Sequence, residues 1–480
     1  MKSFKGEITV FLSLVLIVLL SLLFAIIEAA KDNGADFQTE CVTDMAMQSA
    51  LAEYNKEALE QYELFLIDLG YGRGEGDYSL LEEHIQNYMQ DNFQIETGIM
   101  PVKIRDLLEL NTEYVTIMEA SGAADLSGMV LERKAVDYML DRYGIPDFQK
   151  ICSASAAVEQ EGFLGSAMEE KRLANEQKID EVDTTVEDED GKRHKVPVHN
   201  PADGVNSRRG SMGILKIITE KEGISDRETD LRSCLSHRNY TKRDGFLQGE
   251  QMVSDTEDML FQKYLMETCG YYTKEKEGAL LTYQIEYILS GKSSDLENLR
   301  TVVNRLLILR EAANFVYLIC DTDKKAEAES LAMTLSAVIL FPELKDLIQL
   351  SILIGWAYAE SVNDVKILLE NGKVPLLKSS ESWCLSLQDA MKLKVCKREE
   401  KERSGGGLSY EEYLHLLLAV MDREERNLRF MDLMEMDIRQ TKGNELFCID
   451  HCIHSFTAEI AVSAGNNHTS IIKRTAGYQK

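Results

Sequence analysis

The sequence predicts a mainly α-helical protein with small β elements, an α+β fold, that begins with a single transmembrane helix. An apolar run at the amino terminus is long enough to cross a bilayer. The 480 residues include only 6 Pro and 30 Gly, so residues that break helices are scarce. Apolar residues also recur at helical spacing along most of the chain. The length allows two or three domains, each with its own core.

The first predicted element is the apolar helix from Ile8 to Ile27, which contains no charge, Gly or Pro. At about 1.5 Å per residue it would span roughly 30 Å, the thickness of the hydrocarbon core of a membrane. We expect membrane lipid to contact it through Ile8, Phe11, Leu12, Leu16, Leu19, Leu20, Leu23 and Ile27. A buried core helix and a secretory signal cleaved near Ala29 and Ala30 are the alternatives.

The charges beside this run predict its orientation. Lys2 and Lys5 precede the run, and acidic residues dominate the segment just after it. Lys and Arg are usually retained on the cytoplasmic side. The amino terminus is therefore predicted in the cytoplasm and the body outside, as in a single-pass signal anchor of the cell membrane.

Residues 1–30 form the cytoplasmic flank and anchor, and residues 31–145 are predicted to form a stalk helix and a small α+β domain. The helical pattern continues from the anchor to about Glu60. The later expected elements are a strand over 62–69, a helix over 78–93, strands over 102–108 and 114–118, and a helix over 128–143.

The next region, 146–212, is predicted to be a helical stretch over 148–182 followed by an acidic linker over 187–209. The acidic run 187–190 lacks the ligand spacing of a calcium loop, which favours a solvated turn.

Residues 213–404 are predicted to form a helical domain, and 405–480 a helical pair and a strand. In the domain, helices are expected over 281–289, 296–315, 331–340, 344–360 and 364–370, with short strands or loops over 374–377 and 383–387. The run 344–360 is apolar nearly all round, which predicts burial. Ser409 and Glu412 have the spacing of a capping box at the start of a helix over 410–421. A helix over 423–440 and a strand over 445–457 complete the chain.

The net charge of −28 makes nucleic acid an improbable partner, because phosphate binding needs a basic surface. The nine Cys are dispersed and odd in number, which is not typical of a small disulfide scaffold.

The densest group of potential metal ligands lies between Cys448 and His454. A strand there would place Cys448, Asp450, Cys452 and His454 on one face and His451 on the other. That split favours a half-buried strand over a zinc site. No phosphate loop or nucleophile elbow is present, and Glu311, Glu360 and Glu381 are a weaker possibility for paired acids. The sequence predicts no catalytic residue, no metal and no cofactor.

Several stretches of the sequence look familiar: residues 5–14, 27–31, 289–292, 298–299, 310–311, 356–361, 374–378, 408–414 and 431–434. Together they resemble a bacterial family of uncharacterised membrane-anchored proteins that is associated with Tad-type (Flp) pilus assembly. The amino terminus is also similar to TadE- and TadG-like pseudopilins, whose pattern implies a possible processing site between Gly6 and Glu7. A typical prepilin has Glu at the fifth mature position, where this chain has Phe11. The resemblance covers nearly the whole chain.

The resemblance implies a non-enzymatic, extracytoplasmic component of a Tad-like pilus or secretion apparatus, which would have protein partners of that assembly. A cell-surface sensor or binding protein is one alternative. An anchored enzyme of the cell envelope is another, and it would need a deep pocket with converging His or carboxylate groups.

Overall fold

The computed structural model describes residues 5–74, 76–93, 108–143, 167–187, 193–198, 200–209, 224–247, 251–338, 341–394, 406–465 and 468–478. They divide into two compact units. Unit 1 combines 1–138, 238–253 and 438–480, and unit 2 combines 139–237 and 254–437. Both units are therefore built from segments far apart in the sequence, and the predicted α+β class is confirmed. The five predicted segment limits stay predictions.

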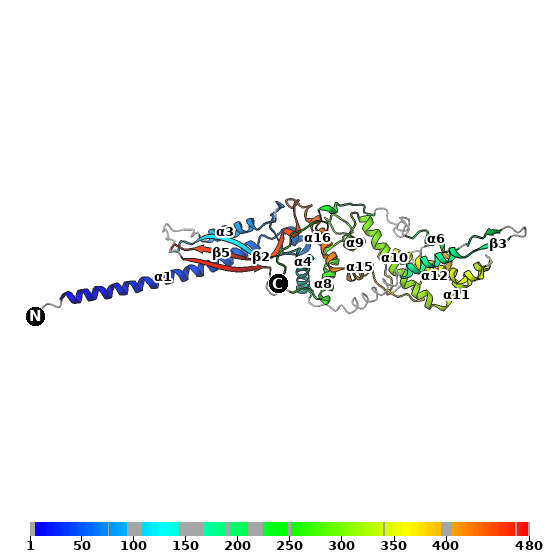
Figure 1. Ribbon diagram of the computed structural model, residues 1–480, viewed down its shortest axis with the longest axis horizontal. Helices are drawn as coiled ribbons and strands as arrows, with labels where there is room; N and C mark the ends of the chain where they lie inside the picture. The colour runs from blue at the N-terminus through cyan, green and yellow to red at the C-terminus, as the bar shows by residue number, and fades with distance from the viewer. Residues whose placement is uncertain are drawn as a thin grey trace. The chain divides into compact units, whose positions relative to one another are not determined.

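Unit 1 is organised around α1 (Lys5–Leu51), which continues from the predicted anchor without a break (Figure 1). The predicted stalk helix is confirmed, but it ends at Leu51 and not near Glu60. Asn55 begins a separate helix, α2 (Lys56–Tyr62), because its side chain accepts a hydrogen bond from the Ala58 amide at 3.0 Å. α3 (Ser79–Phe93) agrees with the helix predicted over 78–93.

An antiparallel sheet provides the surface on which α1 and α3 pack. Its central strand, β5 (Cys452–Ser463), pairs with β2 (Asn111–Gly122) on one side. On the other side it pairs with β6 (Thr469–Gly477) and with the two-residue β1 (Ile67–Asp68). The strand predicted over 62–69 is thus reduced to β1, and β6 was not predicted. The strand predicted over 114–118 is confirmed within β2, whereas the one over 102–108 lies almost wholly outside the described residues.

The core of unit 1 lies between α1, α3 and one face of the sheet. Alternate β5 residues face the helices, which places Phe456, Ala458, Ile460 and Val462 in this core. Burial of these apolar side chains favours the folded state by roughly 25 cal/mol per Å². Helix α4 (Asp125–Tyr143) agrees with the helix predicted over 128–143.

The described segment 238–247 comes from the middle of the chain and is held in unit 1 by two buried carboxylates. Asp125 accepts hydrogen bonds from the amides of Arg243 and Gly245, and Asp450 accepts one from the amide of Thr241. A carboxylate that accepts backbone amides is satisfied when buried, so these contacts fix the segment without regular secondary structure.

Unit 2 is mainly helical. Its elements are a helix over 167–181, β3 (Thr185–Glu187), β4 (Arg193–Lys195), α6 (Asp203–Asn206), the 3₁₀ turns η1 (Leu231–Ser233) and η2 (Leu235–His237), α8 (Asp255–Thr268), α9 (Gln284–Ser290), α10 (Asp295–Cys320), α11 (Thr322–Val338), η3 (Pro342–Leu344), α12 (Lys345–Leu369), α13 (Leu387–Ala390), α15 (Tyr410–Ala419) and α16 (Arg423–Ile438). Of the helix predicted over 148–182, the part before residue 167 lies outside the described residues.

The centre of unit 2 is α12, which is buried from residue 351 through residue 369. The burial predicted for 344–360 is confirmed, but 344–360 and 364–370 belong to one continuous helix. Glu360 and Asp364, which lie where the two predicted runs meet, are buried with partners, so they do not interrupt the helix. The chain turns after α12 at Asn371, whose φ of 63° is left-handed.

Two local predictions need correction. The linker predicted over 187–209 begins within a small hairpin, because β3 pairs with β4 in the register Thr185↔Lys195. The segment Ile449–His451 is a 3₁₀ turn, η4, and the final predicted strand begins only at Cys452. The capping box at Ser409 and Glu412 is confirmed.

Candidate functional site

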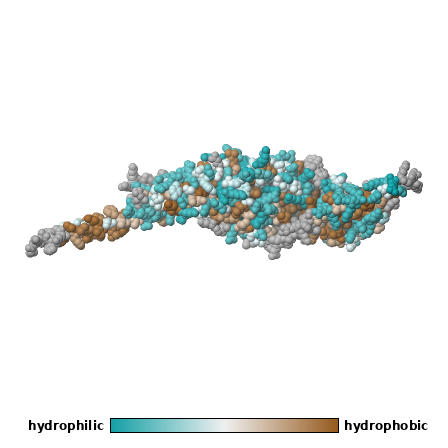
Figure 2. All heavy atoms as spheres, viewed as in Figure 1, coloured by the Kyte–Doolittle hydropathy of each residue, from teal (hydrophilic) through white to brown (hydrophobic). Residues whose placement is uncertain are grey.

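The first half of α1 exposes apolar side chains in every direction. The eight residues predicted to face lipid are exposed by between 44% (Leu20) and 67% (Phe11), and Figure 2 shows this part of the helix as hydrophobic. Mean hydropathy over this part of α1 reaches 3.2, with none of it buried. The hydroxyls of Ser13 and Ser21 donate to the carbonyls of Val10 and Val18 at 2.8 and 2.9 Å. The polar groups are thus satisfied within the helix, which is long and apolar enough to span a membrane.

The residues of the predicted processing site, Gly6 and Glu7, lie at the amino-terminal end of α1. Their role in processing stays a prediction.

The second half of α1 packs on the sheet through mostly small residues. Ala35, Val42, Ala46, Met47 and Ala50 are buried in the core of unit 1. Small side chains allow the helix to approach the sheet closely, so the anchor and the folded part of unit 1 share one continuous helix.

Polar contacts fasten α1 to β6. Asp36 accepts a hydrogen bond from Ser470, and its Oδ1 is 2.8 Å from His468 Nε2. Arg474 Nε donates to Asp44 Oδ1 at 2.8 Å. The hydrogen bonds from Ser470 and His468 lower the pKa of Asp36, and the bond to Asp36 raises the pKa of His468. These contacts are near the surface, so they fix orientation more than they stabilise.

A second polar cluster lies just beyond the end of α1. Glu53 accepts hydrogen bonds from Tyr71 and Tyr88, both at 2.5 Å, and it is 3.0 Å from His84 Nδ1. Burial and the contact with Glu53 raise the pKa of Tyr71, and the hydrogen bond to Glu53 raises the pKa of Tyr88 to about 12. Both phenols stay protonated at neutral pH, so this cluster ties α3 and the Gly-rich loop to the end of α1.

One face of α1 beyond the membrane segment carries exposed apolar side chains. We call Phe37, Cys41 and Met45 the outer stripe; Phe37 is 70% exposed, Met45 is 49% exposed and Cys41 is exposed. They lie four residues apart, on the face opposite the buried residues of α1. Sequence reasoning missed this stripe, although its spacing was a usable signal.

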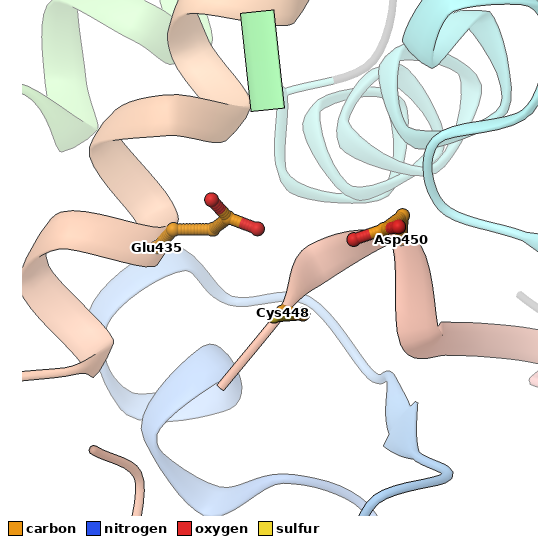
Figure 3. Close-up of side chains that lie close together, drawn as sticks. All are labelled: Glu435, Cys448 and Asp450. Atoms are coloured by element: carbon orange, nitrogen blue, oxygen red, sulfur yellow. The ribbon is translucent and has the colours of Figure 1, made fainter. Parts of the chain in front are cut away.

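The predicted Cys/His segment takes part in packing and in hydrogen bonds within unit 1. Cys448 and Asp450, both labelled in Figure 3, lie at the turn η4 and not on a strand, so the predicted alternation of faces is wrong here. Asp450 accepts from Arg238 Nη2 at 2.6 Å and from the Thr241 amide at 2.9 Å. Although burial opposes the shift, these donors lower the pKa of Asp450. His454 and Cys452 are buried in β5.

The three carboxylates considered as paired acids have separate environments. Glu311 pairs with Arg209 at 2.6 Å, Glu360 pairs with Lys378 at 2.7 Å, and Glu381 is exposed. Of the acidic run 187–190, only Glu187 is described, and it pairs with Arg193 at 2.8 Å.

A hollow of about 550 Å³ lies in unit 2 between the helix over 167–181, the β3–β4 hairpin and α6. Its lining combines acidic and apolar side chains with one Lys: Glu176, Ile179, Asp180, Val182, Lys195 and Asp203 are among the lining residues.

These features define a mixed α+β protein that carries one amino-terminal helix able to span a membrane. The chain belongs to the family of unknown function DUF5702, whose match covers residues 191–464, more than half of the sequence. No curated protein and no solved structure matches it.

Proposed function

We propose that this chain is a non-enzymatic, single-pass component of a Tad-like pilus or secretion apparatus. Its amino terminus would be cytoplasmic, and units 1 and 2 would lie outside the membrane. In this role the anchor holds the protein in the membrane, and the acidic body binds other proteins of the assembly.

The observation that carries the proposal is the division of α1 into two halves. Residues 8–27 are exposed and apolar, whereas 35–51 contribute a buried face to the core of unit 1. A force or displacement applied to the membrane segment is therefore transmitted to the sheet through one helix. That arrangement suits a subunit that packs against neighbours along its anchor, and the resemblance at residues 5–14 supports the same role.

The outer stripe supplies a contact surface for such neighbours. Leu19, Leu23 and Ile26 lie at steps of four and three residues on the same face of the helix, and this group ends eleven residues before Phe37. In lipid, helix association depends on side-chain packing, and above the membrane the stripe removes apolar area from water.

Deletion of the gene tests the role directly. We expect loss of piliation and adhesion, with recovery when the gene is restored; unchanged piliation and adhesion would refute the proposal.

Sequencing the amino terminus of the membrane-extracted protein tests whether the amino terminus is processed. A start at Glu7 would indicate prepilin-type processing, an intact Met1 would indicate a signal anchor, and a start near Lys31 would indicate a released protein.

Disulfide crosslinking tests packing along α1. If like helices meet at the outer stripe, mild oxidation of membranes should join two chains through Cys41. The matched control is Cys41→Ser combined with Lys31→Cys, which moves the thiol to an exposed position off the stripe. Equal crosslinking of both proteins would show that the contact is random collision.

A cell-surface binding protein is the second candidate, and the hollow beside the β3–β4 hairpin favours it. Its acidic lining suits a small cationic ligand more than an anion. If this candidate is correct, Asp180→Asn should weaken ligand uptake without changing piliation.

A further inference from the structure

Lys378 is a buried lysine held between two buried carboxylates of unit 2. It lies in the loop between α12 and α13, and its side chain is only 2% exposed. Its Nζ is 2.7 Å from Glu360 Oε1 and 2.6 Å from Asp364 Oδ1. Glu360 and Asp364 lie one turn apart on α12, so both carboxylates reach the same ammonium group.

The remaining atoms of the two carboxylates have different kinds of donor. Asp364 Oδ2 accepts from Arg310 Nε at 3.2 Å and from Asn314 Nδ2 at 3.0 Å. Glu360 accepts from the amides of Cys384 and Leu385 at 3.0 and 2.9 Å. Asp364 Oδ1 lies 2.6 Å from Lys378 Nζ, and within the described part of the chain no other donor is found for this oxygen. The nitrogen is thus in direct contact with the carboxyl group of Asp364.

We propose that Lys378 and Asp364 join in an intramolecular amide bond, with Glu360 as the group that carries the proton. Lys378 transfers a proton from its ammonium to Glu360, and the neutral Nζ attacks Cγ of Asp364. The Nζ–Cγ bond forms and the Cγ–Oδ1 bond breaks. Glu360 returns its proton to Oδ1, which also takes one from the attacking nitrogen and leaves as water. An ammonium and a carboxylate become an amide and one water, so atoms and charge balance and no oxidant or co-reactant is needed.

The surroundings assist the attack and the return of the proton. Loss of the proton from Lys378 is the unfavourable step: although burial opposes the shift, the charges of Asp364 and Glu360 raise the pKa of Lys378. Negative charge that develops on Oδ2 during the attack is met by Arg310 and Asn314, which already donate to that atom. Burial raises the pKa of Glu360 above that of an ordinary glutamate, which suits a group that must accept and return a proton. The two reacting side chains are held in contact by the fold, which removes the entropic cost of bringing them together.

The amide product buries fewer charges in this cluster than the Lys378–Asp364 ion pair does. The unreacted cluster buries two cations, Lys378 and Arg310, beside two carboxylates, and each buried charge carries a desolvation cost. The amide removes one cation and one carboxylate. Its N–H then has Glu360 as an acceptor, and its carbonyl has Arg310 and Asn314 as donors. The carbonyl of Ser382, which accepts from Lys378 Nζ at 3.0 Å before the reaction, loses that donor.

Mass spectrometry of the full-length protein decides the question. After the amino terminus has been determined, we expect an intact mass lower than the sequence mass by one water. Trypsin should then release fragment 346–366 joined to fragment 374–392, because cleavage after Lys378 is blocked. Separate fragments with the full sequence mass, or a water loss that maps elsewhere, would overturn the proposal.

Three variants assign the roles. Lys378→Arg keeps the positive charge but should give no linked fragment. Asp364→Asn should still link, now with loss of ammonia in place of water. Glu360→Gln keeps both reacting groups, and we expect linkage to slow by about a hundredfold or more. Linkage at an unchanged rate in Glu360→Gln would remove the assigned role of that residue.

Discussion

Glu286 is a buried carboxyl whose ionisation should control the stability of unit 2. It lies on α9, and its Oε1 accepts hydrogen bonds from the Tyr272 amide at 2.9 Å and from Tyr410 at 2.7 Å. Burial raises its pKa from 4.5 to about 7. The folded state therefore holds this proton more tightly, and the free energy of unfolding falls as pH rises from about 4.5 to about 7.

We expect Glu286→Gln to remove this fall, which amounts to about 3 kcal/mol. Both Trp residues, Trp356 and Trp383, lie in unit 2, so urea unfolding followed by Trp fluorescence reports on that unit. The control is Glu381→Gln, because Glu381 is exposed. An unchanged pH dependence in Glu286→Gln would show that Glu286 is ionised throughout this range.

His415 should impose the opposite pH dependence. Burial, together with the charge of Arg426, lowers its pKa from 6.5 to about 4. The folded state resists protonation, so the free energy of unfolding falls as pH drops from about 6.5 to about 4. We expect His415→Gln to remove about 2 kcal/mol of this loss between pH 6.5 and pH 4.5, measured by the same unfolding assay. Glu286 and His415 have opposite effects on the free energy of unfolding between pH 4.5 and pH 6.5. This free energy should therefore rise with pH in Glu286→Gln and fall with pH in His415→Gln. The same pH dependence in both variants would contradict this assignment.

Sequence reasoning found the individual residues of unit 2 but not their partners. Glu360 was recognised as a candidate acid, yet nothing near it in the sequence points to Lys378, which lies eighteen positions later in a loop. The pairing depends on how that loop folds back on α12. Local patterns report periodicity and caps, whereas buried ion pairs depend on tertiary contacts.

At the scale of elements, two methionines of α1 separate packing from assembly. Met45 is 49% exposed in the outer stripe, and Met47 is 3% exposed in the core of unit 1. We expect Met47→Ala to lower the free energy of unfolding of unit 1 by about 2–5 kcal/mol, because it leaves a cavity. Met45→Ala should change it by less than about 0.5 kcal/mol but reduce crosslinking through Cys41. Circular dichroism during unfolding in detergent measures the first effect, and equal destabilisation by both variants would contradict the assigned faces of α1.

Elements were predictable where their signals are local. The apolar helix over 8–27, α3 and the capping box at Ser409 were confirmed because periodicity and cap residues define them. The end of α1 had a usable signal that was missed, since Asn55 can cap a helix. The start of β5 had no local sequence signal. The turn η4 that precedes it is held by contacts from Asp450 to Arg238 and Thr241, which lie about two hundred positions earlier in the sequence.

At the scale of the whole molecule, the chain crosses between its two units several times. Unit 1 is completed only by the final segment, 438–480, so the sheet that holds α1 cannot form until the carboxyl terminus has been made. The apolar half of α1 is synthesised first, and strands β5 and β6 of the sheet on which α1 packs are synthesised last. If residues 8–27 enter the membrane as the proposed role requires, their insertion precedes folding of unit 1, and unit 1 then folds on one side of the membrane.

The side on which they finish can be tested with the chain's own thiols. Cys41 and Cys320 are exposed, the first above the anchor and the second in unit 2. If Lys2 and Lys5 hold the amino terminus in the cytoplasm, a membrane-impermeant maleimide should label both thiols in intact cells in which the outer surface of the membrane is accessible. A Ser3→Cys variant supplies the control, because its added thiol should react only after the membrane is permeabilised. Labelling of Cys41 and Cys320 only after permeabilisation would place the body in the cytoplasm, and the proposed role outside the membrane would then fail.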